Sequence, residues 1–269
     1  MPEGDILART ARRMNEALAG REVVRSDIRW PSAATVSWVG RTVLVTLSYG
    51  KHLLTRFDDD RTLHTHLRMD GSWRIARTGS PGAQARHHVV RAVLANETWT
   101  AVGELIGMLD VVPTRDEHTL IGHLGPDLLA DDFETVGLPE TLRRWAAQGD
   151  RPVCEVLLDQ TVVAGIGTIY MADSLFLEKI WPWTPAAEVP DPGRLLRVAR
   201  AIMVRSVGST SPSTTGEVYR GRDTWVHGRL KEPCRRCGAP VRRGLAGHPP
   251  TERPAYFCGV CQRPAATAA

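Results

Sequence analysis

The first residues of the chain, Met1-Pro2-Glu3-Gly4, have side chains and a terminus that can perform covalent chemistry. Once an aminopeptidase removes Met1, Pro2 becomes the terminus and carries a secondary amine. Such an amine attacks an aldehyde-like carbon and forms an iminium, which is Schiff-base catalysis. Glu3 stands beside it as a carboxylic acid able to move protons. Pro2 and Glu3 are therefore candidate catalytic residues, although an ordinary exposed terminus also fits these four residues.

Four of the five cysteines form a second chemical pattern. Cys234-x2-Cys237 is followed by twenty residues and then by Cys258-x2-Cys261. Two such knuckles bring four thiolates around one tetrahedral Zn²⁺, whereas disulfides are rare in a reducing cytosol. We expect one structural Zn²⁺ on a β-hairpin whose strands include residues 241–243 and 255–257. The fifth cysteine, Cys154, lies in an apolar helical pattern and is expected in the core.

Charge is distributed unevenly along the 269 residues. The net charge is +4, but the segment from Arg200 onward contains twelve Lys and Arg residues and only four Asp and Glu residues. A basic C-terminal third suits a phosphate backbone, and a solvated basic surface is the alternative. No apolar stretch is long enough to span a membrane, and no charged-then-apolar leader is visible. We expect a cytoplasmic protein that acts at the nucleoid and does not associate with membranes.

The elements that must position these residues change in type along the chain. A helix is expected over residues 4–18, with Ile6, Thr10, Met14 and Leu18 on one face. Short apolar or alternating runs then predict a two-sheet sandwich or flattened barrel. The predicted strands cover residues 22–28, 36–48, 52–57, 62–67, 72–75, 88–94 and 104–108.

From about residue 124 to residue 205 the pattern predicts helices. One helix is expected to end at Gly165 in a left-handed turn, and a second to begin after Gly167 with Thr168 as its N-cap. A tight turn of this kind leaves unpaired backbone N–H groups at a helix start, where a phosphate binds well. An ordinary helical hairpin with a glycine-rich corner is the alternative.

Taken together, these features resemble the formamidopyrimidine-DNA glycosylase/endonuclease VIII (Fpg/Nei) family, particularly actinobacterial Nei-type proteins. The resemblance runs almost end to end. Met1-Pro2-Glu3-Gly4 is similar to the family's catalytic terminus, and residues 158–170 to its helix–two-turn–helix signature. The cysteine hairpin is similar to its zinc finger. The resemblance implies an α+β fold with three domains: a catalytic β-sandwich with an N-terminal helix (1–125), a helical domain (126–225) and a zinc finger (226–265).

The resemblance also implies roles for further residues. Gly50-Lys51-His52-Leu53-Leu54 is similar to the strand that carries the family's catalytic-site lysine, so Lys51 joins Pro2 and Glu3. The loop from His66 to Gly71 is similar to the one that fills the space left by a flipped nucleotide. Met69 is the expected wedge and Arg68 the contact to the orphaned base, with Met69 as core filler the alternative.

Phosphate contacts are implied for Gly167, Thr168 and Arg253. Arg253 precedes the second cysteine knuckle, as does the family's hairpin arginine. Thr168 departs from the pattern, because the family usually has Asn at that position. Its hydroxyl can still donate to a phosphate, but its reach differs.

The implied function is a bifunctional DNA glycosylase/AP lyase of base excision repair, acting through Pro2 with β,δ-elimination. The short segment 206–225 and the run Asp70-Gly71-Ser72-Trp73 favour oxidised pyrimidines. Two alternatives stay open: an Fpg-type enzyme for oxidised purines, and a non-catalytic damaged-DNA-binding protein. The expected partner is damaged duplex DNA, with bubble or single-stranded DNA left open, and the expected state is a monomer.

Overall fold

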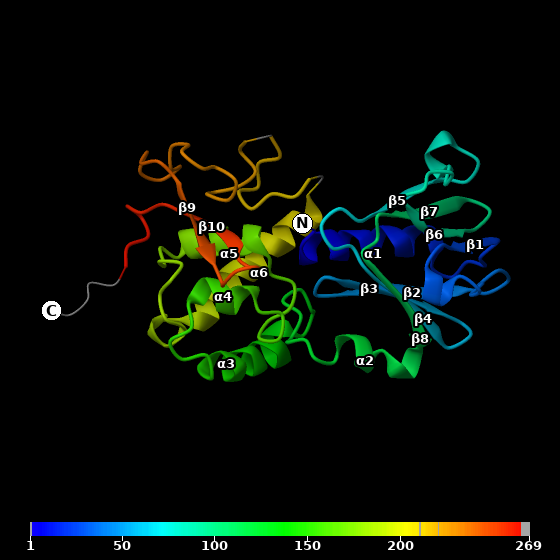
Figure 1. Cartoon of the computed structure of the whole chain (residues 1–269), viewed down its shortest axis with the longest axis horizontal. Coiled ribbons are helices and arrows are strands. Elements are labelled where there is room, and N and C mark those ends of the chain that lie inside the picture. The colour runs from blue at the N-terminus through cyan, green and yellow to red at the C-terminus, as the bar shows by residue number, and fades with distance from the viewer. Residues whose placement is uncertain (1, 210, 220, 265–269) are drawn as a thin grey trace. The chain divides into compact units, whose positions relative to one another are not determined.

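The computed structural model describes residues 2–209, 211–219 and 221–264 and divides the chain into two compact units (Figure 1). The first unit is Met1–His123 and the second is Leu124–Ala269. Each unit contains its own cluster of buried apolar side chains. Among the described residues, no helix has both the length and the apolar character needed to span a bilayer. The predicted three-domain limits, after residues 125 and 225, stay predictions.

Two four-stranded antiparallel sheets make up most of the first unit, which confirms the expected two-sheet architecture. One sheet has the order β1-β6-β7-β5 and the other β2-β3-β4-β8. The strands are β1 (Arg25–Ile28), β2 (Val43–Tyr49), β3 (His52–Phe57), β4 (Arg61–His66), β5 (Ser72–Arg77), β6 (Val90–Ala95), β7 (Trp99–Glu104) and β8 (Met108–Pro113). Short 3₁₀ segments lie at Pro31–Ala33, Pro81–Ala83 and Thr114–Asp116, and a one-turn helix α2 at His118–Ile121.

Two strand predictions differ from the structure. The run predicted at residues 36–48 is a strand only from Val43, where β2 begins. The run predicted at residues 104–108 is not one strand: Glu104 ends β7, Met108 begins β8, and residues 105–107 connect them, with a φ of 49° at Leu105. A left-handed residue of this kind breaks an extended run. Most of β7 and β8 therefore lies outside the predicted strands. In β7 the four central residues are all buried, so the strand lacks the alternation of a half-exposed strand.

Helix α1 (Gly4–Leu18) has the expected bounds but turns a different face inward. Leu7, Ala11, Met14 and Leu18 are buried, whereas the predicted Ile6 and Thr10 are only half-buried. Thr10 donates its hydroxyl to the carbonyl of Ile6, a local bond that satisfies it on the helix surface.

Two asparagines attach α1 to the two sheets. The Asn15 amide donates to the carbonyl of Thr46 at 2.7 Å and accepts from the N–H of Thr46 at 2.6 Å. Because β2 is an edge strand, Asn15 takes the place of a missing neighbouring strand at that point. Asn96, after β6, donates to the carbonyl of Ala17 at 2.8 Å. The helix that follows Pro2 and Glu3 is thus held at its far end by both sheets.

The second unit is helical, with a two-stranded hairpin near its end. Its helices are α3 (Leu138–Ala146), α4 (Val153–Leu158), α5 (Thr168–Leu177) and α6 (Pro192–Gly208), with a π turn at Phe133–Gly137 and a 3₁₀ turn at Ala186–Glu188. The hairpin is β9 (Arg242–Ala246) and β10 (Arg253–Phe257), which confirms the strands expected between the cysteine knuckles. Cys154 is fully buried in the apolar cluster, and burial raises the pKa of its thiol to about 12, as suits a core residue.

Replacing Asn15 by Ala should lower the free energy of unfolding by about 2–4 kcal/mol, because both backbone groups of the buried Thr46 lose their partner. Urea denaturation followed by circular dichroism measures this loss. Glu16→Ala, at an exposed neighbouring position, is the matched control and should change stability little. Equal losses in the two variants would contradict the role of Asn15.

Candidate active site

The chain end that carries Pro2 and Glu3 is held in place. Glu3 occupies the position before α1 with an extended backbone, and its carbonyl accepts from Ile6 N–H at 3.0 Å and Leu7 N–H at 3.3 Å. Its side chain is only 1% exposed, and Pro2 is half-buried. Most chain ends fray unless they are anchored. Here the amine position and the carboxyl group next to it are part of the folded unit.

Lys51 lies in the two-residue turn between β2 and β3, where Tyr49 pairs with His52. Gly50 has a φ of 56°, which a type II′ turn requires at its first central position and which glycine adopts without steric cost. The Lys51 side chain is only 8% exposed. Helix α1 packs against β2 and β3, and its first turn lies at the same end of the unit as the Lys51 turn (Figure 1).

The loop after β4 presents Met69 to solvent. Met69 is 60% exposed, so its alternative as a core filler is wrong, whereas Leu67 is buried. Arg68 has a φ of 58°, its N–H donates to His66 Nδ1 at 2.9 Å, and the stem of its side chain lies across Gly107. Gly71 fits against the Leu67 carbonyl, where an added Cβ would come within 2.4 Å. The loop is therefore a shaped turn that exposes Arg68 and Met69.

Three histidines that the sequence analysis did not single out lie beside Lys51 and this loop. His52 Nδ1 is 2.8 Å from His64 Nε2, and His64 Nδ1 is 3.0 Å from Asp110 Oδ2. The His66 ring packs edge-on against His52, with centroids 4.8 Å apart. The signal was the H-x-H spacing in β4, which places His64 and His66 on one face. Their partners His52 and Asp110 depend on strand register, which the sequence did not reveal.

Burial keeps these histidines neutral. It lowers the pKa of His52 to about 3, with further contributions from His64, His66, His123 and Lys51. Burial likewise lowers the pKa of His66 to about 4, aided by Arg68, His64 and Lys51. The pKa of His64 is also lowered by burial, and the Asp110 carboxylate opposes that shift.

In the second unit, the corner between α4 and α5 differs from the prediction in two details. α4 ends at Leu158, not at Gly165, because Asp159 Oδ1 accepts from the N–H of Thr161 at 2.9 Å and starts a turn. Gly165 does have a positive φ of 104°. The cap of α5 is Gly167 rather than Thr168, which is the first residue of the helix. Thr168 Oγ1 lies 3.3 Å from His227 Nε2.

Gln160 shapes this corner, although the sequence analysis gave it no such role. Its amide N–H₂ donates to the carbonyls of Leu158 and Ile166, and its oxygen accepts from Gly165 N–H at 3.0 Å. One side chain thus fixes both sides of the turn that leads to the N-terminus of α5.

Asp173, on α5, is a second residue with an unforeseen role. It is fully buried, and its carboxylate accepts from the N–H groups of Trp225, Val226 and His227 at 2.8 to 3.0 Å. The hydroxyl of Thr214 also donates to it. The carboxylate therefore folds the connection after α6 back onto α5 and places His227 near Thr168.

The four cysteines are gathered as a metal site requires. All four sulfur atoms lie within 4.8 Å of one another, with Cys234 Sγ–Cys261 Sγ at 3.9 Å and Cys237 Sγ–Cys258 Sγ at 3.5 Å. A tetrahedron with metal–sulfur bonds of about 2.3 Å has edges of about 3.8 Å. The four thiolates can therefore hold one tetrahedral metal ion.

The knuckles are attached to the helices of the same unit. Arg236 donates to the carbonyls of Phe176 and Leu177 at the end of α5, and its guanidinium lies 4.3 Å from the Phe176 ring centroid. Gln262, fully buried, donates to the Ile180 carbonyl at 2.8 Å. Arg253 lies at the start of β10 with an exposed side chain, whose Nη1 donates to the nearby carbonyls of Thr251 at 3.1 Å and Glu252 at 3.3 Å. Its guanidinium is available for a ligand.

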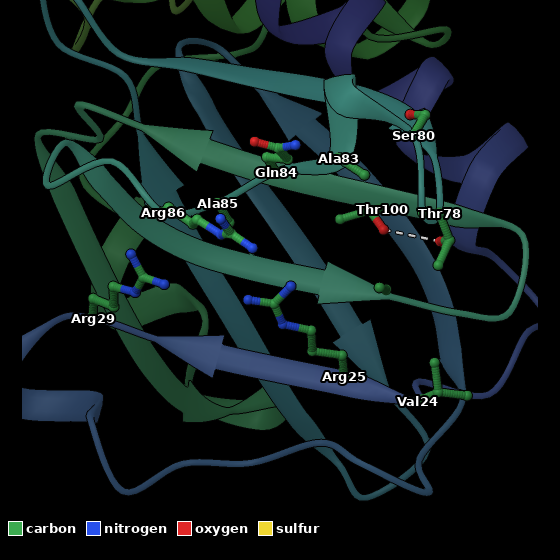
Figure 2. Close-up of a pocket in the computed structure, with 12 residues that line it drawn as sticks. Val24, Arg25, Arg29, Thr78, Ser80, Ala83, Gln84, Ala85, Arg86 and Thr100 are labelled. Carbon is green, nitrogen blue, oxygen red and sulfur yellow. Dashed lines mark hydrogen bonds between the residues drawn. The ribbon is translucent and has the colours of Figure 1, made fainter.

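A hollow of about 460 Å³ lies elsewhere, between β1 and the segment 78–86 (Figure 2). Arg25, Arg29 and Arg86 project into it. Asp27 pairs with Arg29 at 2.7 Å and with Arg25 at 3.5 Å, and the hydrogen bond from Arg29 lowers its pKa. None of the predicted site residues lines this hollow, so it is not the candidate active site.

Comparison with known proteins gives two family matches. Residues 1–104 match the formamidopyrimidine-DNA glycosylase N-terminal domain, and residues 124–216 match the formamidopyrimidine-DNA glycosylase H2TH domain. A Streptomyces coelicolor protein named "Probable endonuclease 8 2" is 42% identical over 264 residues, which cover 97% of this chain and 94% of that protein. The Mycolicibacterium smegmatis protein named "DNA-(apurinic or apyrimidinic site) lyase Nei2" is 38% identical over 262 residues, covering 97% and 99%.

The fold is also similar to solved structures. The Lactococcus lactis Fpg in complex with abasic-site DNA superimposes with a TM-score of 0.80 at 21% identity, covering 97% of this chain and 100% of that one. A complex of the same enzyme with DNA that contains an oxidised pyrimidine gives 0.80 at 22% identity, covering 98% and 100%. At this level of identity the comparison shows the fold.

The neutral histidines predict that stability falls with acidity. In the unfolded chain a histidine takes up a proton near its ordinary pKa of about 6.5, whereas His52 and His66 in the folded protein do so only near 3 and 4. The contribution of these two groups is thus fully present above about pH 6.5 and is lost as the pH falls toward 4. Urea unfolding between pH 7.5 and pH 5 should show this decline, and His52→Asn should make it shallower. Equal slopes in both proteins would contradict a neutral buried His52.

Asp173→Ala should open the segment at residues 225–227, because three buried or half-buried N–H groups lose their acceptor. With a cost of about 3 kcal/mol, hydrogen exchange of these amides should accelerate about a hundredfold. Hydrogen-exchange mass spectrometry of the peptide around residues 223–229 measures this. Asp150→Ala, at an exposed position of the same unit, is the control, and an unchanged exchange rate in Asp173→Ala would disprove the anchoring role.

Proposed function

Because the chain belongs to the formamidopyrimidine-DNA glycosylase/endonuclease VIII family, we propose that it removes oxidised pyrimidines from DNA and cleaves the resulting abasic site through Pro2. Membership rests on the two family matches and on relatives that align over nearly the whole chain. The observation that carries the proposal is the anchored chain end, where a buried Glu3 adjoins the only position that the terminal amine can occupy after removal of Met1.

The first step is base release. The nitrogen of Pro2 attacks C1′ of the flipped nucleotide while the bond from C1′ to the base breaks, and the base leaves with the proton that the Pro2 amine gives up. Glu3, next to the amine, protonates the ring oxygen as the sugar opens. The product is an iminium between Pro2 and C1′. Lys51, on the turn that α1 packs near, supplies a cation for the phosphate or the leaving group.

Strand cleavage follows from the iminium. The positive nitrogen acidifies the C2′–H bond, so loss of that proton expels the 3′ phosphate, and a second elimination expels the 5′ phosphate. Water then hydrolyses the iminium and returns the free amine. Each elimination needs only a proton acceptor and a departing phosphate, so no redox partner takes part.

DNA binding is assigned to residues of both units. Met69 enters the space that the flipped nucleotide leaves, and Arg68 contacts the orphaned base; their exposure in the shaped loop supports this. In the second unit, the N–H groups at Gly167 and Thr168 and the guanidinium of Arg253 bind phosphates. The contact between Thr168 Oγ1 and His227 offers a way for threonine to be oriented where the family usually has asparagine.

The metal is proposed to be Zn²⁺, held by Cys234, Cys237, Cys258 and Cys261, because a closed four-thiolate set fits a structural zinc site. It takes no part in the reaction. It fixes the knuckle from which Arg236 reaches α5 and the hairpin that carries Arg253.

Oxidised pyrimidines are the class of damaged base that we propose as the substrate. The relatives at 42% and 38% identity are named endonuclease 8 and Nei2, which favours oxidised pyrimidines such as thymine glycol. A relative named formamidopyrimidine-DNA glycosylase, from Teredinibacter turnerae, is 33% identical over 252 residues, so oxidised purines are the second candidate. We further propose duplex DNA as the principal substrate, a monomer as the working form and the cytoplasm as its location.

Borohydride trapping of the untagged protein on two labelled duplexes tests the function. One duplex carries thymine glycol or 5-hydroxyuracil, and the other carries 8-oxoguanine opposite cytosine. We expect a covalent adduct on the pyrimidine duplex, reduced at least tenfold in Pro2→Gly, because an unconstrained primary amine replaces the secondary amine that the proline ring holds in place. Arg86→Ala, which removes an exposed arginine outside the proposed site, should trap like the wild type.

The other outcomes separate the alternatives. Trapping on the purine duplex alone would move the protein to the Fpg branch. Absence of an adduct on both duplexes, with Met1 shown by mass to be removed and DNA still bound, would favour the non-catalytic binding protein.

A further inference from the structure

The Asp110–His64–His52 chain is a continuous hydrogen-bonded path across three neighbouring strands. Asp110 is on β8, His64 on β4 and His52 on β3, and the two links are 3.0 and 2.8 Å long. The His64 side chain is 1% exposed and Asp110 is 40% exposed, so the path runs from the surface into the sheet. It ends at His52, the residue directly after Lys51.

The chemistry of the three groups fixes the position of each proton. The Asp110 carboxylate can only accept, so His64 must carry its proton on Nδ1. Neutral His64 then has a lone pair on Nε2, and His52 must donate to it from Nδ1. His52 Nε2 is left as an acceptor. Each group thus sets the tautomer of the next, and one ring orientation follows for His52.

His66 extends this arrangement to the Met69 loop. Its Nδ1 accepts from the N–H of Arg68, so its proton lies on Nε2, and its ring packs edge-on against His52. Arg68 is the residue whose left-handed backbone turns the loop toward Met69. Strand pairing brings the two ends together, since His52 lies directly opposite His66.

We propose that the Asp110–His64–His52 chain positions the Lys51 turn and, through His66, the Arg68–Met69 loop relative to one another for base removal. This inference rests on the proposed function. The histidines are positioning residues, because they act through Lys51 and Arg68 rather than on the DNA. The hydrogen bonds fix the orientation of His52, which adjoins Lys51, and the ring contact of His52 with His66 fixes the Arg68–Met69 loop relative to the Lys51 turn.

If these side chains only filled space in the sheet, hydrogen-bonding groups would not be needed there. Apolar side chains of similar volume could fill the same space in the sheet, and replacement of a buried polar network by apolar groups is often neutral for stability. A polar chain with defined donors and acceptors instead specifies one arrangement of its members. Here the arrangement that is specified is that of the Lys51 turn, which His52 adjoins, and of the Met69 loop, which His66 holds.

The test measures the single-turnover rate of base release on a thymine-glycol duplex, together with the affinity for the same duplex. His52→Leu and His64→Leu should each lower the rate about tenfold or more while the affinity changes less than about threefold, since small misplacement of a reacting group is costly. The double variant should lose no more than the worse single one, because both break one chain. His88→Leu, an exposed histidine outside the chain, is the control.

Conservative variants separate positioning from packing. His52→Asn places an amide N–H where Nδ1 lies, so it should recover the rate to within about threefold of the wild type. If the leucine variants do not fold, Asp110→Ala and Asp110→Asn give the same comparison at a partly exposed position, and only the asparagine keeps an acceptor for His64. Protected Nδ1–H signals of His52 and His64 in nuclear magnetic resonance spectra report the chain directly.

The outcomes are distinct. Folded leucine variants that release the base at the wild-type rate would overturn the inference and leave the proposed function intact. Absence of the Nδ1–H signals would overturn it as well. A wild-type enzyme that releases no base, with the signals present, would overturn the proposed function and this inference with it.

Discussion

A reactive group at the end of a polypeptide is useful only if that end is held still, and this constraint organises the first unit. Pro2 and Glu3 precede α1 directly, so their position depends on how α1 is attached. Asn15 binds it to the edge strand β2 and Asn96 binds it to the connection after β6. The buried stripe from Leu7 to Leu18 completes the attachment. The sheets thus support, through α1, the two residues that we propose as the catalytic terminus.

Local signals predicted much of the architecture. Period-3.6 patterning gave α1 its bounds, and short apolar runs separated by turns predicted two sheets. The cysteine spacing predicted a hairpin with four gathered sulfur atoms. These features depend on nearby residues, on turn chemistry and on metal-ligand spacing, which one sequence displays. The inward face of α1 was misjudged because one-helix periodicity does not identify which of two adjacent stripes meets a sheet.

Two of the contacts that the sequence concealed join residues far apart in the chain. His52, His64 and Asp110 meet through the register of three strands, and Asp173 meets the N–H groups of residues 225–227 across about fifty positions. Gln160 lies within the helix–turn–helix motif, but its hydrogen bond to Gly165 forms only when the corner between α4 and α5 is folded. The end of α4 depended on the Asp159 turn, which competes locally with the helix. Such residues organise the candidate site without belonging to a short motif.

The central claim is that the amine of Pro2 forms the covalent bond to DNA. Its most direct test is proteolysis of the borohydride-reduced protein–DNA adduct, followed by mass spectrometry of the peptide that carries the nucleotide remnant. We expect the remnant on the N-terminal peptide, on the nitrogen of Pro2, with Met1 absent. A remnant on the peptide that contains Lys51, or on any other lysine, would contradict it.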